Sequence, residues 1–163
     1  MTANSPSPVT IRPADPCDAD AWSSMRKGLG PDWLTDFDRH IAEYFAHGTI
    51  QSLRHLVLIA EDDMGPVGLA EVSLRDYAEG CDSSPVGFLE GWFVAERARN
   101  QGLGRLLVAQ AEQWASEQGC TEFASDAELH NAASLHAHER LGFEPVCDIR
   151  CFRKDIASAA PNH

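Results

Sequence analysis

The sequence predicts one α+β domain, with a mixed, mostly antiparallel sheet of about six to seven strands and about four flanking helices. Three observations support this prediction. The chain has 163 residues, 44% of them apolar, which suits a single domain with one core. Two β-rich runs around a short turn indicate an antiparallel hairpin. A strand, a strongly periodic helix and another strand indicate a parallel crossover.

The first half of the chain is predicted to hold a strand, two helices and the hairpin. Apolar residues at helical spacing define the two helices, and glycines end both of them. Two β-rich runs that flank the turn-like residues 62–65 define the hairpin. The elements are, in order, a strand at 9–11, a helix from a cap at Asp15 to Leu29, a helix from Thr35 to about Gly48, and strands at 55–60 and 66–77.

The second half is predicted to alternate strands and helices. Its clearest helix carries a stripe of apolar residues from Leu103 to Ala115 and ends at Gly119. The elements are a strand at 85–94, that helix, a strand at 121–125, a helix at 131–141 and a final strand at 146–153. Residues 1–7 and 157–163 lack apolar periodicity and are expected to be loose, so the domain is expected to span 8–156.

Charge and composition exclude several classes of function. With 25 acidic and 13 basic residues, the net charge of −12 disfavours nucleic acid and anionic membranes as partners. No stretch approaches the ~20 apolar residues that span a bilayer, and the N-terminus lacks the pattern of a signal peptide, so the cytoplasm is expected. The five scattered cysteines form no Cys-x-x-Cys pair, and no histidine motif indicates a metal site, so neither disulfides nor a metal are expected.

A glycine loop between the strand at 85–94 and the next helix is the most informative local motif. In Arg99-Asn-Gln-Gly102-Leu-Gly104, small residues let backbone N–H groups approach a ligand, and the helix start adds unsatisfied donors that suit a pyrophosphate. Taken alone, the motif is better explained as a turn that needs small residues. A Walker loop is excluded, because Gly-Lys-Ser/Thr is absent.

The glycine loop is followed by Asn131 at the next strand end and then by Leu141-Gly142-Phe143. This combination resembles the GCN5-related N-acetyltransferase (GNAT) superfamily, in which such a loop grips the pyrophosphate of acetyl-CoA. The resemblance covers about residues 9–154, since the elements follow the superfamily's order. It implies the GNAT fold and acetyl-CoA as cosubstrate.

Longer strings are similar to bacterial aminoglycoside 6′-N-acetyltransferases. They are Ser84-Pro-Val-Gly-Phe-Leu-Glu-Gly-Trp-Phe-Val94, Gly119-Cys-Thr-Glu-Phe-Ala-Ser-Asp126 and Ser73-Leu-Arg-Asp-Tyr77. The likeness implies direct acetyl transfer to the 6′-amine of an aminoglycoside, and relatives are often homodimers. Two alternatives remain: an acetyltransferase for a polyamine, a small metabolite or a protein N-terminus, and a non-enzymatic CoA-binding module.

The resemblance also implies which residues bind the cosubstrate. Backbone groups of Trp92, Phe93 and Val94 would pair with the pantetheine arm, and the Val94 N–H would face the thioester oxygen. The remaining residues implied for CoA binding are Arg99, Asn100, Gln101, Gly102, Leu103, Gly104, Arg105 and Asn131.

Glu90 lies mid-strand, and simple alternation places it on the face of Phe88 and Trp92. A carboxylate among apolar neighbours needs a partner or a function, so a salt bridge to an arginine competes with substrate contact. The resemblance implies that Glu90 binds the acceptor ammonium and takes its proton.

Three further residues have two interpretations each. Asp126 caps the following helix on sequence grounds, whereas the resemblance makes it an acceptor ligand. Tyr77 either lines the acceptor site or packs in a strand. His138 either protonates the departing thiolate, as a tyrosine does in many GNAT members, or is a satisfied core histidine.

Two departures from the relatives affect the acceptor pocket. Gly30 replaces a common tryptophan before the proline, so Trp33 is expected to fill that space. Near the last strand, Cys147 replaces an acidic acceptor ligand, with Asp148 adjacent.

Overall fold

A mixed sheet is the framework of the computed structural model, which describes residues 8–29 and 36–156. Gly30 and Trp33 therefore lie outside the described residues. The elements are β1 (Thr10–Pro13), η1 (Pro16–Asp18), α1 (Ala19–Lys27), α2 (Phe37–His47), β2 (Thr49–Ile50), β3 (Leu53–Asp62), β4 (Gly65–Arg75), β5 (Val86–Val94), η2 (Glu96–Ala98), α3 (Leu103–Glu117), β6 (Phe123–Ser125) and α4 (Ala132–Leu141).

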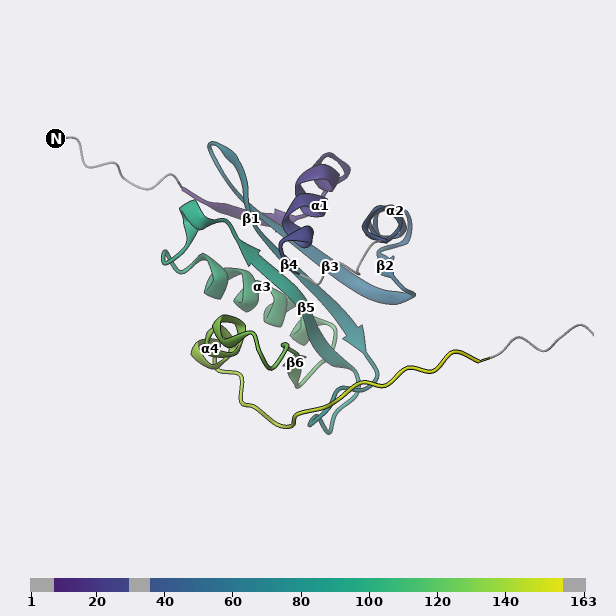
Figure 1. The fold of residues 1–163 in the computed structure, drawn as a ribbon. Helices are drawn as coiled ribbons and strands as arrows, with labels where there is room; N and C mark the ends of the chain where they lie inside the picture. Colours follow the sequence, from purple (N-terminus) through teal and green to yellow (C-terminus); the bar gives the residue numbers. More distant parts are fainter. Residues whose placement is uncertain (1–7, 30–35, 157–163) are drawn as a thin grey trace, which may run out of the picture.

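The strands follow the order β1-β3-β4-β5-β6, with the short β2 paired to β3. The pairs from β1 to β5 are antiparallel, and β6 lies parallel to β5. The predicted hairpin is β3–β4, and the predicted crossover runs from β5 through α3 to β6 (Figure 1). These pairings confirm the α+β class and the mixed sheet.

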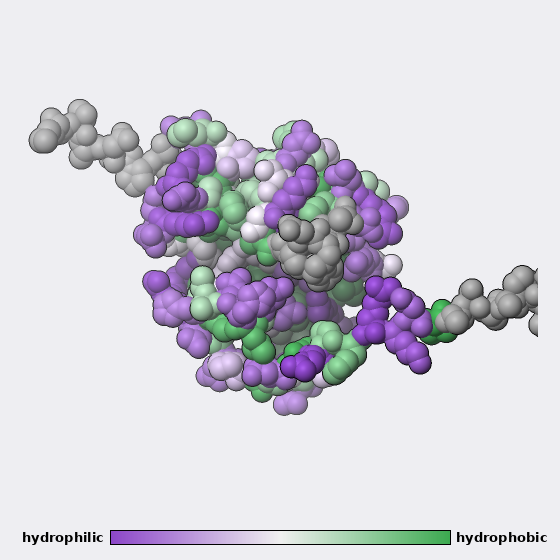
Figure 2. All heavy atoms as spheres, in the orientation of Figure 1, coloured by the Kyte–Doolittle hydropathy of each residue, from purple (hydrophilic) through white to green (hydrophobic). Residues whose placement is uncertain are grey.

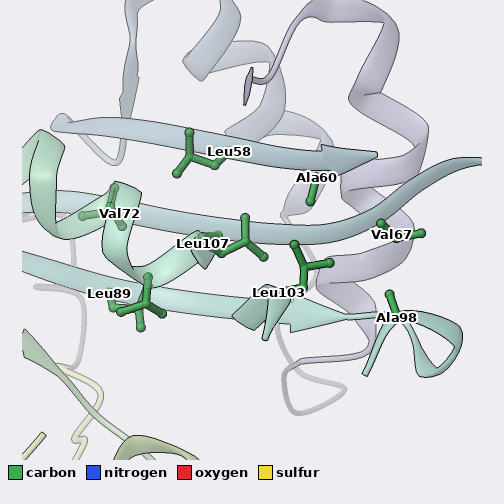
Figure 3. Packing of buried hydrophobic residues seen from close by; sticks show 11 residues of the cluster. Leu58, Ala60, Val67, Val72, Leu89, Ala98, Leu103 and Leu107 are labelled. Atoms are coloured by element: carbon green, nitrogen blue, oxygen red, sulfur yellow. The ribbon is translucent and has the colours of Figure 1, made fainter. Parts of the chain in front are cut away.

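The sheet is covered on both faces, and each face has its own apolar cluster. On one face, Leu103 and Leu107 of α3 pack over Leu58, Val72 and Leu89 of the sheet (Figure 3). On the other face, α1 and α2 cover a cluster that includes the fully buried Trp22. The periodic apolar stripe of α3 is therefore the surface that anchors this helix behind β5.

Asp15 caps the short helix η1, which precedes α1, rather than α1 itself. Its Oδ1 accepts the Cys17 N–H at 2.8 Å, and the Asp18 carboxylate accepts the Asp15 N–H at 2.8 Å. This capping box lies at the N-terminus of η1, and α1 begins only at Ala19. Asp18 also pairs with Arg12 of β1 at 2.7 Å, which ties the start of the helical region to the edge of the sheet.

The final strand predicted at 146–153 does not form within the described residues. Residues 144–156 run as an extended, exposed segment, with Val146, Ile149 and Phe152 respectively 62%, 59% and 90% exposed. The segment passes the loop after β4, where Val146 lies next to Gly80, and then leaves the body of the domain (Figure 1). A β-rich run becomes a strand only when another strand edge pairs with it, and here no described strand does so.

A β-bulge in β5 changes the faces expected for its side chains. Val72 of β4 lies opposite Leu89 and Glu71 opposite Gly91, so Glu90 is the additional residue. The bulge leaves Glu90 on the face of α1 and α2 and moves Trp92 to the face of α3. The expectation that Glu90 and Trp92 share a face is therefore wrong.

Candidate functional site

The candidate site begins where β5 and β6 separate. The two strands pair over only three rungs, and the last of them joins Leu89 to Ser125. Residues 90–94 of β5 continue beyond this rung, while the chain after Ser125 turns toward α4. In the space-filling view, the surface is hollowed between the half that carries α1 and α2 and the half that carries α4 (Figure 2).

The backbone of β5 offers polar groups along this open edge. The Ala95 N–H donates to the Val67 carbonyl at 2.8 Å, which makes Gly68 and Val94 a non-hydrogen-bonded pair of the antiparallel ladder. By alternation, the N–H and C=O groups of Trp92 and Val94 point away from β4, whereas those of Phe93 point toward it. Two of the three residues expected to pair with pantetheine are thus oriented for it.

The glycine loop brings a helix N-terminus beside this edge. Asn100 and Gly102 both have positive φ, 61° and 80°, and α3 starts directly after Gly102. No side chain caps α3, and the first hydrogen bond back to Gly102 comes from the Leu106 N–H at 3.1 Å. The N–H groups of Leu103, Gly104 and Arg105 therefore precede the helix ladder, and they carry the positive end of its dipole.

Open space lies in front of these donors. A Cβ placed on Gly102 would meet nothing within 4 Å, and one on Gly104 only a Val94 methyl at 3.8 Å. The Arg99 Nε donates to the Val94 carbonyl at 3.0 Å and the Gln101 Nε2 to the Arg97 carbonyl at 3.1 Å, so both side chains fold back on the loop. This arrangement fits a diphosphate held by backbone donors.

Arg105 joins the two helices that flank the cleft. Its guanidinium donates to the Arg140 carbonyl near the end of α4 at 2.7 Å, and the side chain is exposed. An arginine at this place adds positive charge beside the donors of α3 and fixes the distance between α3 and α4.

Glu90 is held by three donors from β4. The Ser73 Oγ donates to Glu90 Oε1 at 2.5 Å, and the Arg75 Nε and guanidinium NH2 groups donate to Oε1 and Oε2 at 3.0 and 2.7 Å. The salt bridge weighed as an alternative is thus present. The Glu90 side chain remains 22% exposed, so its contact with an acceptor stays a prediction.

Asp126 and Tyr77 both lie at exposed positions on loops. The N-cap of α4 is Asn131, whose Oδ1 accepts the Ser134 N–H at 3.1 Å, so Asp126 is not the capping residue. Tyr77 lies beyond the end of β4 and is 66% exposed, which excludes strand packing. Cys147 and Asp148 lie on the exposed segment 144–156 and join none of these residues.

His138 is enclosed by aromatic rings and by uncharged hydrogen-bonding groups. Its ring stacks on Trp92 at 5.1 Å, with Phe143 edge-on at 5.3 Å. Nδ1 lies 2.8 Å from the Ser134 carbonyl, which only accepts, so Nδ1 carries a proton. Nε2 lies 2.9 Å from the Ser125 Oγ, at the last rung before the strands separate.

The Ser125 hydroxyl connects His138 to the backbone of β5. It has one hydrogen and lies 3.0 Å from the Leu89 carbonyl as well as beside Nε2. The hydroxyl can donate to either of these groups, and it can accept from Nε2 when Nε2 carries a proton.

Sequence reasoning missed the residues that surround Glu90 and His138. Ser73 and Arg75 are two positions apart on β4 and therefore share a face. This spacing is visible in the sequence Ser73-Leu-Arg-Asp-Tyr77 and could have predicted that both side chains lie together. Ser125 gave no such signal, because its role depends on the register of β6 against β5.

Outside the cleft, one cluster of possible metal-binding side chains occurs among the described residues: Asp15, Cys17 and Asp18. In this cluster, the Asp18 carboxylate already accepts a hydrogen bond from the Arg12 guanidinium. No helix among those residues is both long and apolar enough to cross a membrane.

Comparisons with known proteins give related sequences and related structures. Residues 20–143 match the model of the Acetyltransferase (GNAT) family. An aminoglycoside N(6′)-acetyltransferase type 1 from Klebsiella aerogenes is 45% identical, over 90% of this chain and 96% of its own. Another from Stenotrophomonas maltophilia is 39% identical, over 98% of this chain and 100% of its own.

Two solved structures are also similar. AAC(6′)-Iy, in complex with the bisubstrate analogue CoA-S-monomethyl-acetylneamine, superposes with a TM-score of 0.81 at 34% identity, over 92% of this chain and 100% of its own. The 6′-N-acetyltransferase AAC(6′)-Ih from Acinetobacter baumannii gives a TM-score of 0.79 at 36% identity, with the same shares covered.

Proposed function

Because the chain belongs to the acetyltransferase (GNAT) family, we propose that it transfers an acetyl group from acetyl-CoA to the 6′-amine of an aminoglycoside. The observation that carries this proposal is the separation of β5 from β6 beside the uncapped start of α3. The open edge and the helix start offer donors for an acyl-CoA, while Glu90 and Asp126 offer carboxylates for a cationic acceptor. The enzyme would work in the cytoplasm, where acetyl-CoA is supplied.

The cosubstrate would lie along the open edge of β5. The outward N–H and C=O groups of Trp92 would hold the pantetheine arm as an added strand is held, since the Val94 carbonyl already accepts from the Arg99 Nε. The N–H groups of residues 103–105 would bind the pyrophosphate, with Asn131 beside the CoA chain. A Val94 N–H that faces the thioester oxygen would stabilise the oxyanion formed on attack.

Acetyl transfer would proceed directly between the two substrates. The neutral amine attacks the thioester carbon and the carbon–sulfur bond breaks. The nitrogen gives its extra proton to water, and the thiolate takes a proton from His138. Glu90 and Asp126 would orient the aminoglycoside, with Tyr77 at the rim. Most of the rate would come from holding the substrates together and from stabilising the oxyanion.

His138 is the proposed source of the proton for the thiolate, because its ring stacks on Trp92 and its Nε2 lies 2.9 Å from the Ser125 Oγ, where β5 and β6 separate. His138→Gln should lower kcat by about 10²-fold and remove one limb of the kcat–pH profile, as expected for loss of a general acid. The Michaelis constant for acetyl-CoA should stay the same. His136→Gln, an exposed residue of the same helix, is the control. An unchanged pH profile in His138→Gln would leave His138 a packing residue.

The acceptor is tested by an assay of CoA release with a panel of amines. Kanamycin-type acceptors with a 6′-amine should react, and matched compounds with a 6′-hydroxyl should not. Glu90→Gln combined with Asp126→Asn should raise the acceptor Michaelis constant about tenfold or more, since two carboxylates that accept hydrogen bonds from the acceptor are lost. Turnover of spermidine or peptides in place of aminoglycosides would assign another acceptor, and CoA binding without any turnover would indicate a regulatory module.

We also infer that the enzyme is a homodimer in which the segment 144–156 pairs with a second copy. The segment exposes large apolar side chains, and among the residues that the structure describes, no strand pairs with the outer edge of the three-residue β6. An unpaired β-rich segment and an unpaired sheet edge in one chain complement each other in a symmetric pair.

A further inference from the structure

The carboxylate of Glu90 is paired before any acceptor arrives. The Arg75 side chain approaches it with two nitrogens, Nε at 3.0 Å and NH2 at 2.7 Å, in the fork geometry that suits a carboxylate. The same guanidinium lies 3.5 Å above the centroid of the Phe88 ring, which adds a cation–π contact. Arg75 is therefore held from two sides.

Three other polar groups face Glu90: His55 of β3, and Ser73 and Glu71 of β4. Burial raises the pKa of Glu71, and Arg26 of α1 pairs with Glu71 rather than with Glu90. Burial lowers the pKa of His55 below its ordinary value, so this ring is neutral at pH 7. Glu71 is fully buried against the Trp22 Nε1 at 2.5 Å and the Arg26 Nε at 3.3 Å. Each carboxylate beneath the acceptor site thus has its own guanidinium.

This pairing matters because only a neutral amine attacks a thioester. A lone carboxylate beside an amine stabilises the ammonium form and removes the nucleophile. A carboxylate that is neutralised by a fixed guanidinium still accepts a hydrogen bond, because the three donors leave one lone pair of its two oxygens free. It can therefore hold the amine without favouring its protonation.

We propose that Arg75 is a positioning residue that cancels the charge of Glu90, so that Glu90 orients the acceptor amine without holding it as an ammonium ion. This inference rests on the proposed function, in which Glu90 contacts the acceptor. Arg75 does not contact the amine in this proposal; it influences the protonation of the amine by neutralising Glu90.

Arg75→Gln tests the proposal through the pH dependence of turnover. An uncompensated charge within 4–6 Å shifts a titration by about 1–3 units. The variant should therefore show kcat about tenfold lower at about pH 7, and the ratio of wild-type to variant kcat should fall as the pH rises, because the neutral fraction of the amine grows in both enzymes. The acceptor Michaelis constant should fall, because Glu90 then attracts the ammonium form.

Two further variants keep the result interpretable. Arg75→Lys preserves the charge, so it should keep the wild-type pH profile even if Arg75→Gln does not fold. Arg39→Gln removes another arginine that pairs with a carboxylate, Asp36 at 3.0 Å at the start of α2, and it should change neither constant.

The outcomes separate this inference from the proposed function. If the wild-type enzyme turns over no aminoglycoside, the proposed function fails. If it does, a loss of kcat by the same factor at every pH in Arg75→Gln, a raised acceptor Michaelis constant at unchanged kcat, or an alkaline shift in Arg75→Lys would each overturn the role given to Arg75.

Discussion

Gly102→Val is expected to raise the Michaelis constant for acetyl-CoA about 10²-fold, with a smaller effect on kcat. Gly102 has a φ of 80°, in the left-handed region where a β-branched residue is strained by roughly 1–2 kcal/mol. The new side chain would also enter the open space before the first N–H groups of α3. Steady-state kinetics and direct CoA titration measure the loss.

Gly48→Val separates backbone strain from lost binding. Gly48 ends α2 with a φ of 70°, and a Cβ there also meets nothing within 4 Å, but it lies away from the cleft. Both variants should lose a similar amount of thermal stability, and only Gly102→Val should weaken CoA binding. Equal Michaelis constants for acetyl-CoA in the two variants would contradict the assignment of the loop.

Local patterns predicted most of the fold because they record which side chains must be buried. The apolar stripe of α3 specifies a helix with one buried face, and the two β-rich runs around the turn at residues 62–65 specify a hairpin. The boundaries follow from glycines at positive φ, such as Gly48 and Gly142. These signals lie within a few residues of the structure they determine.

The candidate site depends more on register, which sequence reports poorly. The bulge at Glu90 reverses the face of Trp92, and with it places the Trp92 ring against His138. The pairing of Leu89 with Ser125 places a hydroxyl beside the same histidine. Both features arise from long-range strand pairing, which no periodicity within β5 or β6 encodes. The family resemblance identified the candidate site residues in the sequence, but only the structure shows which residues they contact.

The strand expected at 146–153 is the part of the fold that the sequence predicted wrongly. Its exposed apolar residues lead to a prediction about dimerisation. The segment does contain large apolar residues, but no described part of the same chain buries them. A strand that lacks an intramolecular partner is satisfied by an edge on another molecule. Charge at its apolar positions should therefore abolish association and leave the fold of the domain intact.

Ile149→Asp combined with Phe152→Asp is expected to convert the dimer to a monomer in sedimentation equilibrium at micromolar concentration. Two buried apolar contacts would become buried carboxylates, which cost far more to desolvate than apolar groups. Met64→Asp is the matched control, because Met64 is also highly exposed, at 78%, but lies in the β3–β4 turn. Dimers that persist in the double variant, or a wild-type chain that sediments as a monomer, would contradict pairing through this segment. Circular dichroism of the monomer should match the wild type, because both core clusters are formed by residues before position 144.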